Sequence, residues 1–389
     1  MRTIVTLLVL LISSGARAQP PKPSMDAAQH KKAAKEHAQN HDELLATAQW
    51  RAAAELGDAE AQFTLARRLE RGLGVTDYPD LKAKAKVEAE ALDLQALAQG
   101  YPPAVDRVRK AAEQGDAKAQ AKLGLALAAQ GDYEGAIDYY RAALEAGALD
   151  AAGLHAMGDL LASGKVEAEP GEAVRVYDRA IAKGDERAEI ALASLYFEGK
   201  GGVARDAEQG QRVLMKGVSK GRTASALELG RRFEMGDGLE LNQPAALRVY
   251  TKCAARECVL ARALLLVDGI NVRHDARTAI DLLRDYAHAG WFPAVDALLT
   301  IANKGEQGAQ LLIADMYLRG QGIEQDAYEA VRWYGEAAAQ GNPGALFILG
   351  DLYARGDGVA QDAGKARDYF ERASEAGSLQ ARARLSTLR

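Results

Sequence analysis

The sequence predicts an all-α protein, built as an α-solenoid of stacked antiparallel helix pairs. Two observations carry this prediction. One sequence pattern recurs about every 36 residues, and a period of that size is typical of helical units that bury one another's faces. The composition agrees, because the chain has only 10 prolines in 389 residues and is rich in alanine and leucine, which favour helices.

The clearest copy of the pattern spans residues 344–377 and contains two helical segments separated by a loop. Gly356 and Gly358 lie in the loop, where the chain leaves a helix through positive φ. Asp362 occupies the N-cap position of the second segment, which ends at Gly377. The same order of residues begins, clearly or more loosely, at Gly308, Ala188, Ala224, Ala59, Ala117 and Ala151.

The first eighteen residues have the parts of a secretory signal. Arg2 gives a charged start, residues 4–12 are an apolar run, and Ala16-Arg17-Ala18 fits the small-residue rule for cleavage after Ala18. The run is too short to span a bilayer, which takes about 20 apolar residues, and no other stretch approaches that length. We therefore expect a periplasmic protein that does not span the membrane, with secretion as the alternative.

Residues 19–43 differ in composition from the rest of the chain. Pro20, Pro21 and Pro23 are followed by polar residues with almost no large apolar side chain. Such a segment cannot bury enough surface to be a domain of its own. We interpret residues 19–43 as a polar flexible leader that runs into a helix, and we place the repeat solenoid in residues 44–389.

Two short segments interrupt the regular pattern. Residues 101–115 begin Tyr-Pro-Pro-Ala-Val-Asp, and residues 291–305 begin Trp-Phe-Pro-Ala-Val-Asp. Each has room for a single helix, so we expect the alternation of helix faces, and with it the curvature, to change at both places. The two segments either mark a duplication within the array or are repeats that lost their middles independently.

The motif in residues 345–377 resembles a Sel1-like repeat. It reads Ala-Leu-x-x-Leu-Gly-x-Leu-Tyr-x-x-Gly-x-Gly-Val-x-x-Asp-x-x-x-Ala-x-x-Tyr-Phe-x-x-Ala-x-x-x-Gly, and the resemblance extends over most of residues 44–389. It implies a right-handed superhelix related to tetratricopeptide arrays. It also implies a scaffold or adaptor that binds another protein, in envelope assembly, exopolysaccharide export or the regulation of a membrane sensor.

Cys253 and Cys258 are the only cysteines of the chain. Within one continuous helix their Cα atoms would be about 8–9 Å apart, beyond the limit of about 7 Å for a disulfide. The pair lies where one helical unit passes to the next, and across a turn the separation falls into range. An oxidising compartment favours the bond, and some exported Sel1-like proteins carry cysteine pairs at this place. The alternatives are a disulfide that staples the turn and two buried free thiols.

Three histidines share one predicted helical face in the leader. His30, His37 and His41 are spaced i, i+7 and i+11, with Asp42 beside them, and such a set can bind a transition metal. A solvated polar leader explains these histidines equally well. A metal site on such a helix would also have no surrounding residues to orient its ligands. We therefore predict no metal and no cofactor. The other histidines are expected at the surface or in loops: His155, His274 and His288.

Aromatic residues recur on the second helix of successive units. They either form a ladder for a ligand or fill the seam between neighbouring helices, and the repeat favours the seam. Trp291 and Trp333 bracket the second irregular segment, where large rings make good interface anchors. We therefore expect partner contacts at Trp291, Trp333 and Tyr334. The recurring residues are Tyr139, Tyr140, Tyr177, Tyr250, Tyr286, Trp333, Tyr334, Tyr369 and Phe370.

The chain carries little sign of catalysis or of nucleic-acid binding. The Ser-x-x-Lys, Lys-Thr-Gly and His-Glu-x-x-His motifs do not occur. The net charge is −5 and the basic residues are scattered, which argues against a nucleic-acid partner. We predict a non-enzymatic scaffold. The alternatives are a cell-wall-directed enzyme or small-molecule binder (β-lactamase-like), recognised by a deep pocket of converging acids, and a secreted effector that binds a host protein.

Overall fold

The computed structural model describes residues 25–75 and 79–387. The predicted signal segment and the start of the leader lie outside these residues. All regular structure in the described part of the chain is helical, without any strand, which confirms the all-α prediction. The chain divides into two units, one of residues 1–185 with 200–202 and the other of residues 186–199 with 203–389. Each is described by itself.

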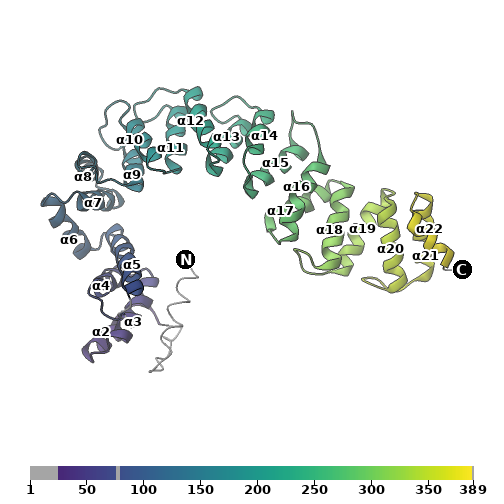
Figure 1. Ribbon diagram of the computed structural model, residues 1–389, viewed down its shortest axis with the longest axis horizontal. Coiled ribbons are helices and arrows are strands. Elements are labelled where there is room, and N and C mark those ends of the chain that lie inside the picture. Colours follow the sequence, from purple (N-terminus) through teal and green to yellow (C-terminus); the bar gives the residue numbers. More distant parts are fainter. Residues whose placement is uncertain (1–24, 76–78, 388–389) are drawn as a thin grey trace. The chain divides into compact units, whose positions relative to one another are not determined.

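In unit 1, each helix packs on the next helix along the chain (Figure 1). Helices α2 and α3, α4 and α5, α7 and α8, and α9 and α10 form pairs. α6 lies alone between two pairs and is a single helix. The helices are α2 (Ala27–Gln39), α3 (Glu43–Glu55), α4 (Ala59–Glu70), α5 (Pro79–Ala98), α6 (Pro102–Glu113), α7 (Ala117–Gln130), α8 (Tyr133–Glu145), α9 (Ala151–Ala162) and α10 (Glu172–Ala182).

Unit 2 repeats this arrangement with five pairs, the single helix α17 and the terminal helix α22. The paired helices are α11 (Arg187–Glu198) with α12 (Ala207–Ser219), α13 (Thr223–Met235) with α14 (Gln243–Thr251), α15 (Arg256–Asp268) with α16 (Ala276–His288), α18 (Gln307–Arg319) with α19 (Ala327–Ala339), and α20 (Pro343–Arg355) with α21 (Ala363–Glu375). The others are α17 (Phe292–Asn303) and α22 (Leu379–Thr387).

Part of the predicted leader is a packed helix. Asp26 caps α2, because its side chain accepts a hydrogen bond from the Gln29 backbone while the Gln29 side chain accepts one from the Asp26 backbone. Ala34 is fully buried on this helix. Lys31 Nζ lies 2.8 Å from Asp58 Oδ2 and forms a second ion pair with Glu60. Residues 27–39 therefore belong to the array, which corrects the boundary placed at residue 43.

The recurring aromatic rings pack on glycines of the preceding helix. A Cβ built on Gly350 would lie 2.6 Å from the Phe370 ring, and one on Gly158 would lie 2.6 Å from the Tyr177 ring. Both rings are buried. The glycines thus allow the two helices of a pair to approach, and these aromatic residues fill the seam between them.

The glycine loop of a clear repeat lies close to the repeat before it, as Gly358 illustrates. Gly358 has φ 72°, and a Cβ at this position would lie 2.3 Å from the carbonyl oxygen of Ala327. The Asp362 side chain then accepts a hydrogen bond from the Lys365 backbone at 2.9 Å. The glycine is therefore required both by its positive φ and by the close approach of the preceding repeat, whereas the N-cap is set by local backbone geometry.

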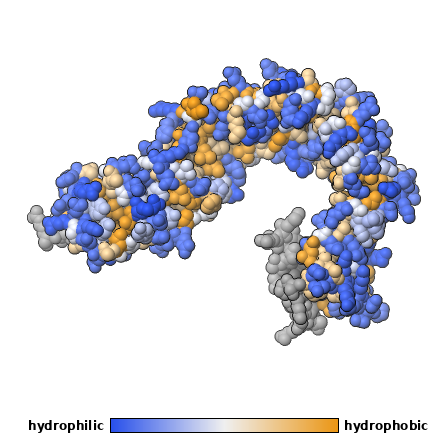
Figure 2. All heavy atoms as spheres, turned by 180° about the vertical axis from the view of Figure 1, so that it is seen from behind, coloured by the Kyte–Doolittle hydropathy of each residue, from blue (hydrophilic) through white to orange (hydrophobic). Residues whose placement is uncertain are grey.

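Hydrophilic residues cover much of the face seen in Figure 2, with hydrophobic residues showing between them. This distribution is what amphipathic helices produce when they bury one face against their neighbours. Among the helices that the structure describes, none combines the length and the apolar character that crossing a membrane requires.

Candidate functional site

Two of the three predicted partner-binding residues are buried. Trp333 is 3% exposed and Tyr334 is fully buried, and the Tyr334 hydroxyl donates a hydrogen bond to Asp315 on α18. Helix α19 packs against α18 and α20, so adjacent positions on it face different neighbours. The expectation that Trp333 and Tyr334 contact a partner is therefore wrong, and both rings serve the seam.

Trp291, the third residue, is only partly buried. Its ring meets the Tyr286 ring edge-on at 5.7 Å between centroids, and the Arg256 guanidinium lies 4.9 Å from the Trp291 ring centre. The next residue, Phe292, is 73% exposed. Exposed aromatic surface is thus present at the start of α17.

Cys253 and Cys258 form a disulfide across the turn between α14 and α15. Their Cα atoms are 5.9 Å apart, since α14 ends at Thr251 and α15 begins at Arg256. Cys258 is fully buried and Cys253 nearly so. Of the two alternatives drawn from the sequence, the structure contains the disulfide rather than two buried free thiols.

The leader histidines do not converge on one point. The buried His30 ring lies with Nδ1 2.7 Å from Gln49 Oε1 on α3. His37 is in the last turn of α2, and His41 lies in the following turn with φ 59°. Within residues 25–75 and 79–387, no three His, Cys, Asp or Glu side chains are arranged to hold a metal ion.

His155 has a more specific setting than the sequence predicted. It lies on α9 with a side chain only 15% exposed, and not in a loop. Its Nδ1 is 3.2 Å from Asp185 Oδ2, and its Nε2 is 3.4 Å from Asp159 Oδ2. Asp159 also accepts a hydrogen bond from the Tyr177 hydroxyl at 2.7 Å. The cluster joins α9 to α10 and to the residues after it.

A groove lies between α8 and α10 of unit 1, and we call it the α8–α10 groove. It contains two cavities of about 660 and 250 Å³. The cavities adjoin each other, since both are lined by Leu144 and Arg179. The connection between α9 and α10 forms one wall of the larger cavity through Glu167, Ala168, Glu169 and Pro170. The buried side chain of Val176 contributes to its floor.

Four charged side chains of the larger cavity satisfy one another. Arg141 donates two hydrogen bonds to Glu172, Nε to Oε1 at 3.1 Å and Nη2 to Oε2 at 3.0 Å. This contact lowers the pKa of the Glu172 carboxyl, which stays ionised at neutral pH. Arg175 Nη2 donates to Glu169 Oε2 at 3.2 Å. These four residues hold the wall of the groove in place.

Three other charged side chains of the groove, Arg179, Glu145 and Glu167, form no hydrogen bond or ion pair with the described residues. Arg179 stands between the two cavities, whereas Glu145 and Glu167 line only the larger one. The charged residues of the smaller cavity, Arg179 and Lys183, are both basic, and Lys183 Nζ donates to the Leu149 carbonyl at 2.7 Å. The rest of its lining is Leu144, Gly147, Leu149, Leu154 and Ala182.

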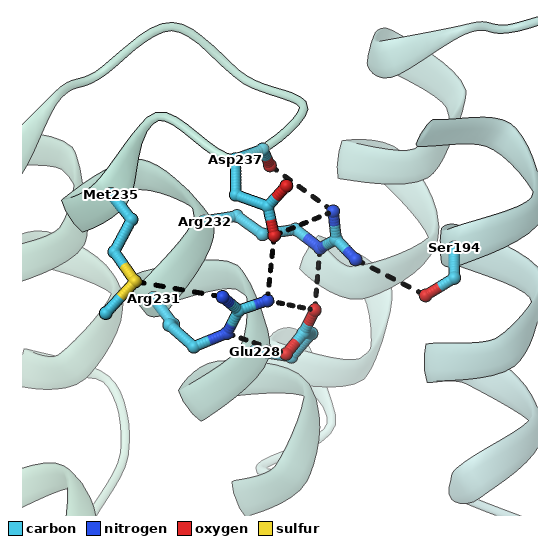
Figure 3. A network of polar contacts seen from close by, with 6 residues as sticks. All are labelled: Ser194, Glu228, Arg231, Arg232, Met235 and Asp237. Atoms are coloured by element: carbon cyan, nitrogen blue, oxygen red, sulfur yellow. Dashed lines mark hydrogen bonds and ion pairs between the residues drawn. The ribbon is translucent and has the colours of Figure 1, made fainter. Parts of the chain in front are cut away.

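The arginines of unit 2 drawn in Figure 3 have a different use. The side chains of Arg231 and Arg232 converge on Glu228 and Asp237, and Arg232 reaches Ser194 of α11. Arg232 is only 5% exposed, with Nε 2.6 Å from Glu228 Oε1. These guanidinium groups hold the loop after α13 against α11. Arg179, in contrast, has no partner in the described residues and is available to a ligand.

A carboxyl with a raised pKa lies outside the groove. Burial raises the pKa of Asp93 on α5, although Arg67 and Arg107 form ion pairs with it at 2.9 and 3.2 Å. Asp93 lines neither cavity of the groove. A carboxyl with a perturbed pKa inside a pocket would favour the enzyme alternative, but Asp93 lies outside the α8–α10 groove.

A serine-hydrolase spacing, Gly-x-Ser-x-Gly, occurs at residues 217–221. In those enzymes the serine occupies a sharp turn between a strand and a helix. Ser219 instead ends α12, and its hydroxyl donates to the Lys216 carbonyl at 2.7 Å. The motif therefore lacks the context that makes such a serine a nucleophile.

Comparison with known proteins supports the repeat assignment. A family model of the Sel1 repeat matches residues 59–80, 187–212, 223–256, 308–342 and 343–378. A search of curated proteins found no match. Similar solved structures include a protective antigen of uropathogenic Escherichia coli strains with an SLR fold, with 24% identity over 92% of this chain and 86% of that chain and a TM-score of 0.36.

Two further solved structures are similar to the chain. A Sel1 repeat protein from Oxalobacter formigenes has 25% identity over 98% of this chain and 99% of that chain, with a TM-score of 0.36. Helicobacter pylori cysteine rich protein B has 20% identity over 29% of this chain and 97% of that chain, with a TM-score of 0.24. Five segments of the chain, one in unit 1 and four in unit 2 (residues 200–202 aside), match the model of the Sel1 repeat.

Proposed function

We propose that the chain is a periplasmic protein-binding scaffold and that a segment of its partner occupies the α8–α10 groove. The groove carries this proposal, because it joins an apolar floor to three charged side chains, Arg179, Glu145 and Glu167, that have no partner in the described residues. Protein interfaces combine an apolar centre with a polar rim in this way. The paired charges around Arg141 and Glu172 keep the groove preformed.

Export is proposed from the sequence of residues 1–18, with its charged start, apolar run and Ala-Arg-Ala site. A disulfide between Cys253 and Cys258 suits an oxidising compartment. The processes that we propose for the scaffold are envelope assembly, exopolysaccharide export or the regulation of a membrane sensor. Trp291 stays a second proposed contact, since Phe292 beside it is exposed.

Photo-crosslinking in the producing cells tests this proposal. A photoreactive phenylalanine derivative replaces Ala182 at the edge of the groove, and the control replaces Ala129, which is exposed on α7 outside it. We expect a protein adduct from position 182 and none from position 129. Equal adducts at both positions, or none at either, would contradict the proposed site.

The same cells are fractionated to test the location. We expect the chain, shortened at its N-terminus, in the periplasmic fraction. Recovery from the culture medium would instead favour the secreted effector that binds a host protein.

A further inference from the structure

We propose that the α8–α10 groove selects peptide segments in which an apolar side chain lies next to a carboxylate. This inference rests on the proposed protein-binding function and adds the chemistry of the bound segment. The apolar side chain enters the smaller cavity, and the carboxylate pairs with Arg179.

The smaller cavity fits one apolar side chain. Its volume is about 250 Å³, several times the roughly 30 Å³ that a water molecule takes up in the liquid. The cavity therefore has room for a side chain. Leu149 and Leu154 are buried in its lining, and Leu144 is partly buried. An apolar side chain placed there removes its own surface and the exposed part of Leu144 from water, and burial of apolar surface is the main favourable term in most associations.

The charges around this cavity select an acid. Arg179 and Lys183 are its only charged lining residues, and a guanidinium binds a carboxylate through two parallel hydrogen bonds. Because Arg179 has no partner in the described residues, a ligand carboxylate displaces no existing ion pair. Lys183 is held by the Leu149 carbonyl and adds a second fixed positive charge.

The larger cavity gives the bound segment a direction. Glu145 and Glu167 line it and have no partner in the described residues, whereas its other acids, Glu169 and Glu172, are paired with arginines. A second acid of the peptide would be repelled there, whereas a basic or polar residue would be accepted. The segment therefore lies with its apolar and acidic residues at the smaller cavity and its other end towards Glu145.

Selection from a displayed library of random nonapeptides tests the inference on the full chain. We expect enrichment of sequences in which leucine, isoleucine or phenylalanine adjoins aspartate or glutamate. A synthetic peptide from that pool should bind Arg179→Glu at least about tenfold more weakly, because hydrogen bonds between charged groups are strong. Selection on Arg179→Glu should replace the enriched acid with lysine or arginine.

Two matched controls separate binding from folding. Arg109→Glu reverses the charge of an exposed arginine on α6 outside the groove and should leave binding unchanged. Lys183→Glu, which reverses the second positive charge of the smaller cavity, should weaken binding, whereas Lys110→Glu on α6, outside the groove, should not. Circular dichroism checks that each variant keeps its helix content.

The outcomes distinguish this inference from the function on which it rests. A library without acidic enrichment, or the same enrichment with Arg179→Glu, overturns the peptide chemistry even if the crosslinker at position 182 captures a protein. Acidic enrichment that depends on Arg179, without any adduct in cells, supports the peptide chemistry and contradicts the scaffold role.

Discussion

The Tyr250 ring lies against Gly230 so closely that a Cβ on the glycine would stand 2.2 Å from Cε1 of the ring. The Tyr250 hydroxyl donates to Glu234 Oε2 at 3.0 Å, one helical turn beyond Gly230. A single ring thus sets the distance between α13 and α14 through one steric contact and one hydrogen bond.

We expect Gly230→Ala to destabilise unit 2. Alanine favours a helix over glycine by roughly 0.5–1 kcal/mol, but the added methyl group meets the buried Tyr250 ring, and overpacking a core costs about 1–3 kcal/mol. The net effect is a lower free energy of unfolding, measured by urea denaturation followed by circular dichroism.

Gly335→Ala on α19 is the matched control, because a Cβ at that helical position meets no atom within 4 Å. There only the helix preference acts, and stability should rise by roughly 0.5–1 kcal/mol. Two variants that move in the same direction would show that the ring contact does not set the helix spacing.

Tyr140 and Tyr177 occupy equivalent seams but differ at the hydroxyl. The fully buried Tyr140 hydroxyl has no hydrogen-bond partner in the described residues, whereas the Tyr177 hydroxyl donates to Asp159. A buried polar group without a partner costs about 1–3 kcal/mol. We therefore expect Tyr140→Phe to keep or raise the melting temperature.

Tyr177→Phe should lower the melting temperature, since it removes a hydrogen bond worth about 1 kcal/mol. Both changes delete one oxygen from a buried ring, so they are controls for each other. A loss of stability in Tyr140→Phe equal to that in Tyr177→Phe would show that a bound water satisfies Tyr140.

The repeat could be predicted from the sequence because each of its rules is local. The positive φ of Gly358 and the capping hydrogen bond of Asp362 reflect backbone geometry within a few residues, and that pattern recurs in every clear copy. The faces of Trp333 and Tyr334 could not be read in the same way. Two neighbouring helices cover α19, so consecutive residues on it are both buried, and aromatic character alone does not separate a seam from an interface.

The α8–α10 groove leaves no pattern in the sequence. Leu144 comes from α8, Arg179 from α10 and Glu169 from the connection between α9 and α10, and nothing in their spacing brings them together. Arg141, Arg175 and Arg179 look alike in the sequence, yet only Arg179 has no partner in the described residues. His155 is a similar case, because Asp185 comes from beyond α10.

The attachment of α2 should depend on pH. The hydrogen bond from Lys31 lowers the pKa of Glu60. A carboxyl with a lowered folded-state pKa adds stability above its unfolded pKa of about 4.3 and loses it as the pH falls through the folded pKa. We therefore expect amide hydrogen exchange in residues 27–39, corrected for intrinsic rates, to accelerate below about pH 4.

Lys31→Ala should remove this protection at neutral pH, because it deletes both ion pairs, to Asp58 and to Glu60. Lys32→Ala is the control, since Lys32 is exposed and has no partner in the described residues. Equal protection of α2 in both variants would mean that Ala34 and the rest of the apolar contact hold this helix alone.

The Cys253–Cys258 disulfide should stabilise unit 2 modestly. The cysteines are five residues apart, and the chain-entropy estimate for so short a loop is about 2 kcal/mol. For a unit of this size, that corresponds to a fall in melting temperature of about 4–8 °C on reduction. The measurement is thermal unfolding with and without dithiothreitol.

The double variant Cys253→Ala/Cys258→Ala should melt near the reduced wild type and should not respond to dithiothreitol. Alanine is preferred to serine here because Cys258 is fully buried, and a serine hydroxyl there would add its own desolvation cost. Since the chain has no other cysteine, a response of the double variant to reductant would have another cause. A wild type that melts at the same temperature in both conditions would show that the packing of α15 on α14, rather than the bond, fixes this turn.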